Sequence, residues 1–117
     1  MTKPVVYACM GCSNVGRMAH DIALTLDQDG LAEMSNLSGI LADNEGLLTT
    51  LEKSTSVIVI DGCEEHCSKE CLTEKGVEID QHFTLTSVGI IKRDKWQDSL
   101  VDNSKAVNYV YQKLQNS

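Results

Sequence analysis

Aromatic residues, prolines and long apolar runs are scarce in this sequence. Only 4% of the 117 residues are aromatic and the one proline is Pro4, so the core must be built mainly from aliphatic side chains. No apolar run approaches the roughly 20 residues of a membrane-spanning helix. The N-terminal segment reaches Cys9 too soon to form a signal peptide. We therefore expect a cytoplasmic protein without a membrane partner.

The sequence also has few positively charged residues. Ten Lys and Arg residues stand against 17 Asp and Glu residues, which gives a formal net charge of −7. Nucleic-acid binding depends on clustered cations that neutralise phosphates, so we expect no nucleic-acid partner. The same deficit disfavours adsorption to an anionic membrane surface.

Short apolar runs alternate with helical patterns along the chain. Strands are predicted at four runs rich in β-branched or other apolar residues: 5–8, 31–35, 57–60 and 77–85, with 88–91 as an extension of the last. Helices are predicted between and after these runs: 18–29, 45–53, 63–75 and from 97 onward, with a loop or turn at 37–40.

The alternation predicts the fold class. Strands that alternate with helices form a parallel or mostly parallel sheet covered on both faces. Four consecutive β-branched residues at Val57 to Ile60 predict a strand in the middle of that sheet. We therefore expect an α/β protein with three α/β/α layers and a four-stranded, mostly parallel sheet of the flavodoxin or Rossmann type. Its length fits a single domain over residues 1–117.

The five cysteines fall into two groups, each just after a predicted strand. Cys9 and Cys12 follow the first strand, whereas Cys63, Cys67 and Cys71 follow the third. An odd number of cysteines excludes a fully paired set of disulfides, and a reducing cytoplasm leaves thiols free for metal or redox chemistry. If the two strands are neighbours, both groups meet in the crevice at the carboxyl edge of the sheet.

Four thiolates in one crevice match the tetrahedral coordination that zinc prefers. We favour Cys9, Cys12, Cys63 and Cys67 as ligands of one metal ion, most simply zinc. If the helix begins near Cys63, Cys71 lies about 12 Å further along its axis, too far to share an ion with Cys63. A helix that begins later would instead allow Cys67 and Cys71 to act as a pair one turn apart.

Two residues beside the cysteines have alternative interpretations. His66 is a possible replacement for one thiolate, although its neighbours Glu64 and Glu65 favour a solvated helix position. Asp61 is expected to cap the helix after the third strand rather than to act in acid–base chemistry. His20 and His82 are expected to be surface or structural residues.

At Asp61-Gly62-Cys63 the chain resembles the DGC domain family, which takes its name from this tripeptide. The resemblance also covers the segment from Tyr7 to Gly16, the stretch up to Cys67, and the later Gly89-Ile90. It implies metal binding, described for the family as zinc binding, by Cys9, Cys12, Cys63 and Cys67. The fourth cysteine of the family matches either Cys12 or Cys71. The resemblance implies no particular activity.

The same cysteines allow other chemistry. A Cys9-x-x-Cys12 pair between a strand and a helix is typical of thiol–disulfide redox proteins, but the facing cis-proline of thioredoxin-like folds is absent. An iron–sulfur cluster with cysteine ligands is a less favoured alternative. A closed four-thiolate site has no open coordination position, so we favour a non-enzymatic role while leaving catalysis open.

The segment from Gly11 to Gly16 has the spacing of a phosphate-binding loop. Arg17 and Met18 replace the Lys and the Ser or Thr of the nucleotide-hydrolysing motif, so nucleotide hydrolysis is not expected. Backbone amides at the start of the following helix, near Ser13 and Asn14, still suit an anion or a thiolate. A tight turn between strand and helix is the simpler interpretation.

Overall fold

The structure is a computed structural model that describes residues 3–9, 13–62, 64–94, 96–97 and 99–115. Of the four cysteines expected to bind metal, Cys9 and Cys67 are within this part of the chain. Cys12 and Cys63 lie outside the described residues, so their positions are not discussed.

The described residues form a four-stranded sheet in which all neighbouring strands are parallel. Its strands are β1 (Val5–Ala8), β2 (Glu33–Met34), β3 (Val57–Asp61) and β4 (Gln81–Thr84), in the order β2-β1-β3-β4. This arrangement confirms the predicted parallel sheet. It also makes β1 and β3 neighbours, paired from Val5 with Val57 to Ala8 with Ile60.

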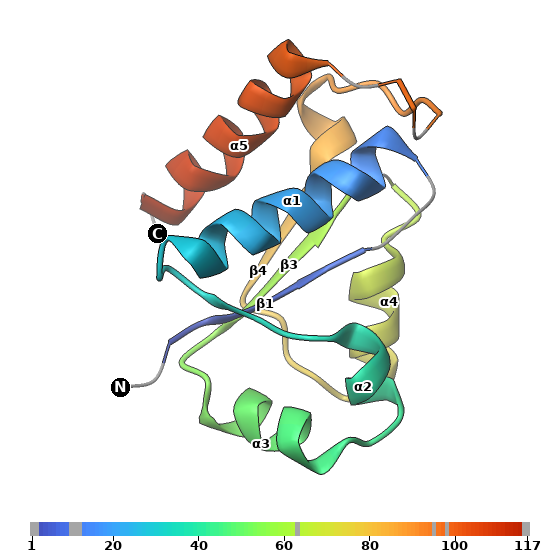
Figure 1. Ribbon diagram of the computed structural model, residues 1–117. Coiled ribbons are helices and arrows are strands. Elements are labelled where there is room, and N and C mark those ends of the chain that lie inside the picture. The colour runs from blue at the N-terminus through green and yellow to red at the C-terminus, as the bar shows by residue number, and fades with distance from the viewer. Residues whose placement is uncertain (1–2, 10–12, 63, 95, 98, 116–117) are drawn as a thin grey trace.

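Helices cover both faces of the sheet (Figure 1). They are α1 (Asn14–Gln28), α2 (Leu37–Leu41), α3 (Glu45–Lys53), α4 (Cys67–Glu74) and α5 (Leu100–Gln115), with a 3-10 helix, η1 (Leu85–Val88), after β4. One face carries α1 and α5, and the other carries α2, α3 and α4. The three-layer α/β/α arrangement expected from the sequence is confirmed.

Alternation along the strands divides the core into two halves. In β1, Val6 and Ala8 pack toward α1 and α5, while Val5 and Tyr7 pack toward the other three helices. Successive side chains of a strand point to opposite faces, so a strand covered on both sides needs apolar residues at every position. The uninterrupted apolar runs in β1 and β3 follow from this requirement, and every residue of both strands is buried.

The structure differs from the expectation in two helical segments. Residues predicted as a loop at 37–40 form α2, because the side chain of Asn36 accepts a hydrogen bond from Gly39 N–H and caps a short helix. The helix expected directly after Gly62 begins only at Cys67. The later start places Cys67 and Cys71 one helical turn apart.

The fourth strand is shorter than the apolar pattern suggested. Pairing stops at Thr84, and the chain then forms η1, which ends at Gly89 with a φ of 87°. Leu85 and Ile90 are nevertheless buried in the core. The apolar residues beyond Thr84 reflect burial rather than strand pairing.

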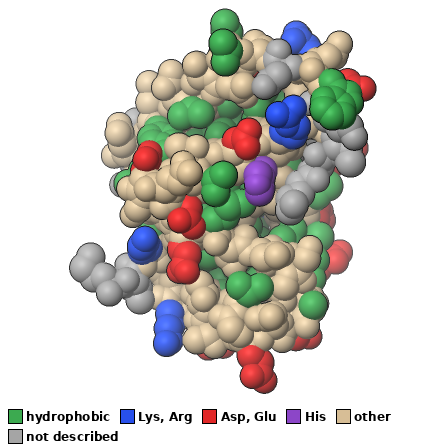
Figure 2. Space-filling view, in the orientation of Figure 1, with side chains coloured by type: hydrophobic (Ala, Val, Ile, Leu, Met, Phe, Trp, Pro, Cys, Tyr) green, Lys and Arg blue, Asp and Glu red, His purple; other side chains and the backbone are tan. Residues whose placement is uncertain are grey.

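The surface carries dispersed charge. On the face in view, acidic side chains are scattered and the basic ones stand apart from one another (Figure 2). No helix within the described residues is long and apolar enough to cross a bilayer.

We predict that Leu72→Ala destabilises the protein by about 2–5 kcal/mol, because Leu72 is fully buried and anchors α4 against the sheet. Leu100→Ala is the matched control, since Leu100 is 86% exposed at the start of α5. Its effect should stay within about 0.5 kcal/mol. Urea denaturation measures both variants, and equal losses would contradict the packing of α4 described here.

Candidate functional site

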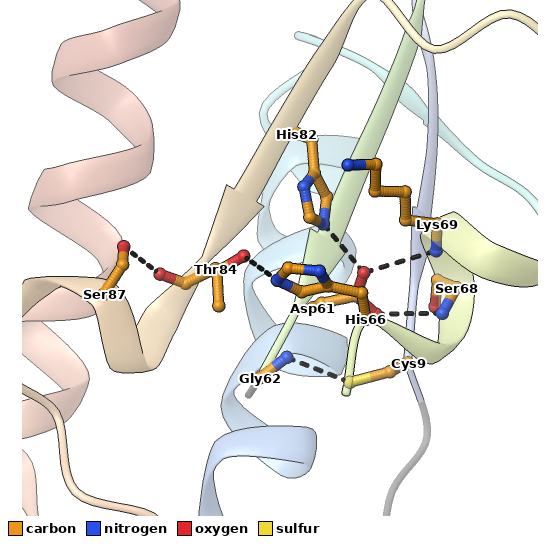
Figure 3. Close-up of polar contacts among 9 residues, drawn as sticks. All are labelled: Cys9, Asp61, Gly62, His66, Ser68, Lys69, His82, Thr84 and Ser87. Carbon is orange, nitrogen blue, oxygen red and sulfur yellow. Dashed lines mark hydrogen bonds and ion pairs between the residues drawn. The ribbon is translucent and has the colours of Figure 1, made fainter. Parts of the chain in front are cut away.

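The carboxyl ends of β1 and β3 hold Cys9 in a fixed position. Cys9 directly follows β1, and its N–H donates a hydrogen bond to Ile60 O at 3.1 Å, so the parallel pairing continues past the strand. Gly62 N–H then donates to Cys9 Sγ at 3.2 Å (Figure 3). An amide aimed at the sulfur stabilises the deprotonated form, which is the form that binds metal or attacks a disulfide.

A cavity of about 520 Å³ opens at this edge of the sheet. Cys9 and Cys67 both line it, although all the elements from α1 to β3 lie between them in the sequence. The first turn of α1 and the segment Lys92–Arg93 form other parts of its wall. Cys71 is not among the described residues that line this cavity.

Asp61, the last residue of β3, fixes the start of α4. Its carboxylate is 1% exposed and accepts hydrogen bonds from Ser68 N–H at 2.9 Å and Lys69 N–H at 3.3 Å (Figure 3). The residue preceding the helix, His66, makes no capping bond through its side chain. The Asp61 carboxylate caps the helix instead, because it accepts hydrogen bonds from the first amides. Its negative charge also interacts favourably with the positive end of the helix dipole. The expectation that Asp61 caps this helix is confirmed.

Two histidines complete the contacts of Asp61 and the loop before α4. His82, on β4, places Nε2 at 2.8 Å from Asp61 Oδ2. The His66 ring lies edge-on to the His82 ring, with 4.8 Å between centroids, and His66 Nε2 is 3.1 Å from Thr84 Oγ1. His82 is thus a structural histidine, as expected.

The interpretation of His66 as a solvated helix position is wrong. His66 is half-buried, lies just before α4 and has a left-handed backbone conformation with a φ of 50°. Its ring also lines the cavity. Contacts with a residue of β4 explain the difference, because local sequence does not reveal which strand lies beside this loop.

Gly62, directly after β3, lies close to the first turn of α1. A Cβ at this position would lie 2.6 Å from the carbonyl carbon of Val15 and 2.7 Å from its oxygen, distances that carbon side chains do not tolerate. Only glycine therefore allows the end of β3 to lie against α1. That approach is also what directs the Gly62 amide at Cys9.

A further contact ties the loop after β3 to η1. Thr86 Oγ1 donates a hydrogen bond to Glu64 Oε1 at 2.7 Å. This hydrogen bond lowers the pKa of the exposed Glu64 carboxyl, with smaller contributions from neighbouring charges. Glu64 is therefore tied to the segment that follows β4.

The described part of the chain contains no group of three or more His, Cys, Asp or Glu side chains arranged to hold a metal ion. It contains Cys9 and Cys67 from the expected set, and both face one cavity. These two donors fit a soft metal ion, because a thiol that accepts an amide hydrogen bond suits the thiolate that zinc and iron–sulfur clusters require. Cys12 and Cys63, the other two expected ligands, lie outside the described residues.

No sequence pattern assigned Thr84, Lys92 or Arg93 to the site, and His82 was expected only as a surface or structural residue. His82 and Thr84 come from β4, and Lys92 and Arg93 come from the segment after η1. No motif marks them. They reach the site only because β4 lies next to β3 and the following segment returns to α1.

Comparison with known proteins identifies relatives of this chain. The model of the DGC domain family matches residues 5–110. The anaerobic and virulence modulator AnvM of Pseudomonas aeruginosa is 43% identical over 90 residues, which is 77% of this chain and 69% of that protein. No solved structure matches.

We predict that Asp61→Asn destabilises the fold by at least about 2 kcal/mol. The amide keeps the shape of the carboxylate but loses the charge, and it directs an NH₂ group at donors that need an acceptor. Glu78→Gln is the matched control, because Glu78 is exposed. It should change stability by less than about 0.5 kcal/mol in the same denaturation measurement. Equal free energies of unfolding for the two variants would contradict the capping role of Asp61.

Gly62→Ala should also destabilise the protein, by about 1–3 kcal/mol, because the added methyl group forces β3 away from α1. Gly46→Ala is its control. Gly46 lies in the first turn of α3, where a Cβ would meet only Asn44 Oδ1 at 3.4 Å. Alanine there should be neutral or stabilising, because it favours helix more than glycine does. A tolerated Gly62→Ala variant in thermal or urea denaturation would contradict the close approach.

Proposed function

The chain belongs to the DGC domain family, and we propose that it is a metal-binding protein in which Cys9, Cys12, Cys63 and Cys67 hold one zinc ion. The observation that carries this proposal is the meeting of Cys9 and Cys67 at one cavity. Cysteines from two separate segments have no structural reason to gather beside polar groups, since free cysteine otherwise behaves as a small core residue.

The surroundings of Cys9 support a thiolate. Its sulfur already accepts the Gly62 amide at 3.2 Å, and the Cys9 amide is occupied by Ile60 O. The sulfur is thus oriented by backbone groups of two paired strands, which restricts where it can lie. A metal ligand held in this way binds with little loss of conformational entropy.

Cys67 is positioned by the capping of α4. It is the first residue of this helix, and Asp61 holds the amides of Ser68 and Lys69, the next two residues. Asp61 therefore acts as a positioning residue for Cys67, while Gly62 acts in the same way for Cys9. Asp61, the last residue of β3, and Gly62, which follows it, thus each orient one cysteine, and the two cysteines belong to different groups.

Zinc bound by four thiolates would cross-link the loop after β1 to the loop and helix after β3, and would contribute to stability. Cys71 remains outside this set because it does not line the cavity. We also place the protein in the cytoplasm, where thiols stay reduced and available to metal. The name of the Pseudomonas relative describes a modulator, which agrees with a binding or regulatory role.

We predict that the untagged protein, purified without added metal, contains about one zinc ion per chain by elemental analysis, with four thiols protected until a chelator is added. Cys9→Ser and Cys67→Ser should each lose the metal. Cys71→Ser is the matched control, since it lies on the same helix as Cys67 but away from the cavity, and it should retain the metal.

Three results would contradict this proposal. If Cys71→Ser loses the metal and Cys67→Ser retains it, the ligand is Cys71 and not Cys67. Visible absorption with bound iron would indicate a cluster instead of zinc. A metal-free protein with a reversible disulfide between Cys9 and Cys12 would replace metal binding with thiol–disulfide chemistry.

A further inference from the structure

The strand β4 carries two polar side chains on the face of the sheet that α4 covers. In the parallel register Val59 pairs with His82 and Asp61 pairs with Thr84, so these side chains all point toward the layer that contains α4. Phe83 lies between the two and belongs to the core on the opposite face. Parallel strands between two helical layers usually carry apolar residues at every position. The half-buried His82 and Thr84 depart from that pattern, and their contacts explain why.

His82 reaches the start of α4 through Asp61. Its Nε2 lies 2.8 Å from Asp61 Oδ2, the oxygen that also accepts Lys69 N–H at 3.3 Å, while Oδ1 accepts Ser68 N–H at 2.9 Å (Figure 3). One carboxylate therefore links β4 to two amides in the first turn of the helix. Rotation of this carboxylate would break both amide bonds, and the contact with His82 opposes the rotation.

Thr84 reaches the residue that precedes Cys67. Its Oγ1 lies 3.1 Å from His66 Nε2, and the His66 ring packs edge-on against the ring of His82. His66 has a left-handed backbone conformation, with φ 50° and ψ 46°. A residue with a side chain keeps this conformation only where its surroundings hold it, and Thr84 and His82 supply those surroundings.

The conformation of His66 determines how α4 begins. His66 O accepts a hydrogen bond from Glu70 N–H at 2.9 Å, which closes the first turn of the helix. Cys67 is the first residue of that turn and lines the cavity. The direction in which Cys67 leaves the loop is therefore set by contacts from β4 on both sides of it, at His66 and, through Asp61, at Ser68 and Lys69.

We propose that β4, which contributes no cysteine, positions Cys67 through two positioning residues: Thr84 acts through His66, and His82 acts through Asp61. The inference rests on the proposed function in one respect, because it takes Cys67 as a metal ligand. A ligand that is oriented before the metal arrives binds it with a smaller loss of conformational entropy. Groups that orient metal ligands in this way typically change metal affinity by about 10–100-fold.

Amide hydrogen exchange in the metal-free protein, measured by nuclear magnetic resonance, tests the first route. Thr84→Val keeps the branched shape of the side chain but removes the hydroxyl, so exchange of the Glu70 amide should accelerate about tenfold. Thr84→Ser keeps the hydroxyl and should restore slow exchange. Thr25→Val is the matched control, because Thr25 is also half-buried and its Oγ1 donates a hydrogen bond, but to Asp21 O within α1. It should leave exchange in α4 unchanged.

The second route has its own reporters. His82→Leu removes the group that faces Asp61, so the amides of Ser68 and Lys69 should exchange about tenfold faster. His82→Gln keeps an amide donor and should restore much of the protection. The amide of Ile58, which is buried in β3, measures general unfolding and should be unaffected in each variant.

Zinc affinity, measured by competition with a coloured chelator, tests the consequence for the metal. Thr84→Val and His82→Leu should each weaken zinc binding by about tenfold, whereas Thr84→Ser and Thr25→Val should bind zinc as the original protein does.

Four results would overturn the proposal: unchanged exchange at the reporters of either route, equal acceleration at Ile58, failure of Thr84→Ser to restore slow exchange, or unchanged affinity of both variants in a protein that binds zinc. A protein that binds no zinc contradicts the proposed function alone. Exchange in the metal-free protein then still decides whether β4 positions Cys67.

Discussion

The contacts made by Asp61 and Gly62 at the end of β3 determine the geometry of the site. The buried Asp61 carboxylate holds the first amides of α4 and meets His82 of β4, so it ties a helix to two strands. Gly62 packs against the first turn of α1 and directs its amide at Cys9. Two adjacent residues thereby join both helical layers to the centre of the sheet. A buried carboxylate is tolerated here because three donors compensate for its desolvation.

The hydrogen bond from Gly62 to Cys9 depends on β1 and β3 being neighbours. In a parallel sheet whose strand order reverses at this point, α1 leaves toward one face and α4 lies on the other. The two helices therefore separate at the carboxyl edge and leave a crevice between their first turns. Cys9 lies at one side of that crevice and Cys67 at the other, with the amide of Gly62 aimed at the Cys9 sulfur.

Much of this arrangement could be predicted from the sequence. The runs at Val5–Ala8 and Val57–Ile60 indicated buried parallel strands, and helix boundaries such as Glu45–Lys53 followed from apolar spacing and caps. The capping role of Asp61 could be predicted, but the residue at which α4 begins could not. Asp61 accepts the amide of Ser68 from seven positions earlier in the chain, whereas a cap normally stands directly before its helix. The contacts of His66 could not be predicted either, since they depend on β4 lying beside β3.

Net charge bears on large partners but gives no information about small ones. A formal charge of −7 acts on a polyanion that spans the surface, whereas screening limits the field at one site to about 8 Å at physiological ionic strength. Within that distance the described lining of the cavity carries charges of both signs, because Lys92 and Arg93 lie there with Asp61 and Glu65. The net charge of the whole chain therefore does not determine which charge a small ligand of this cavity would carry.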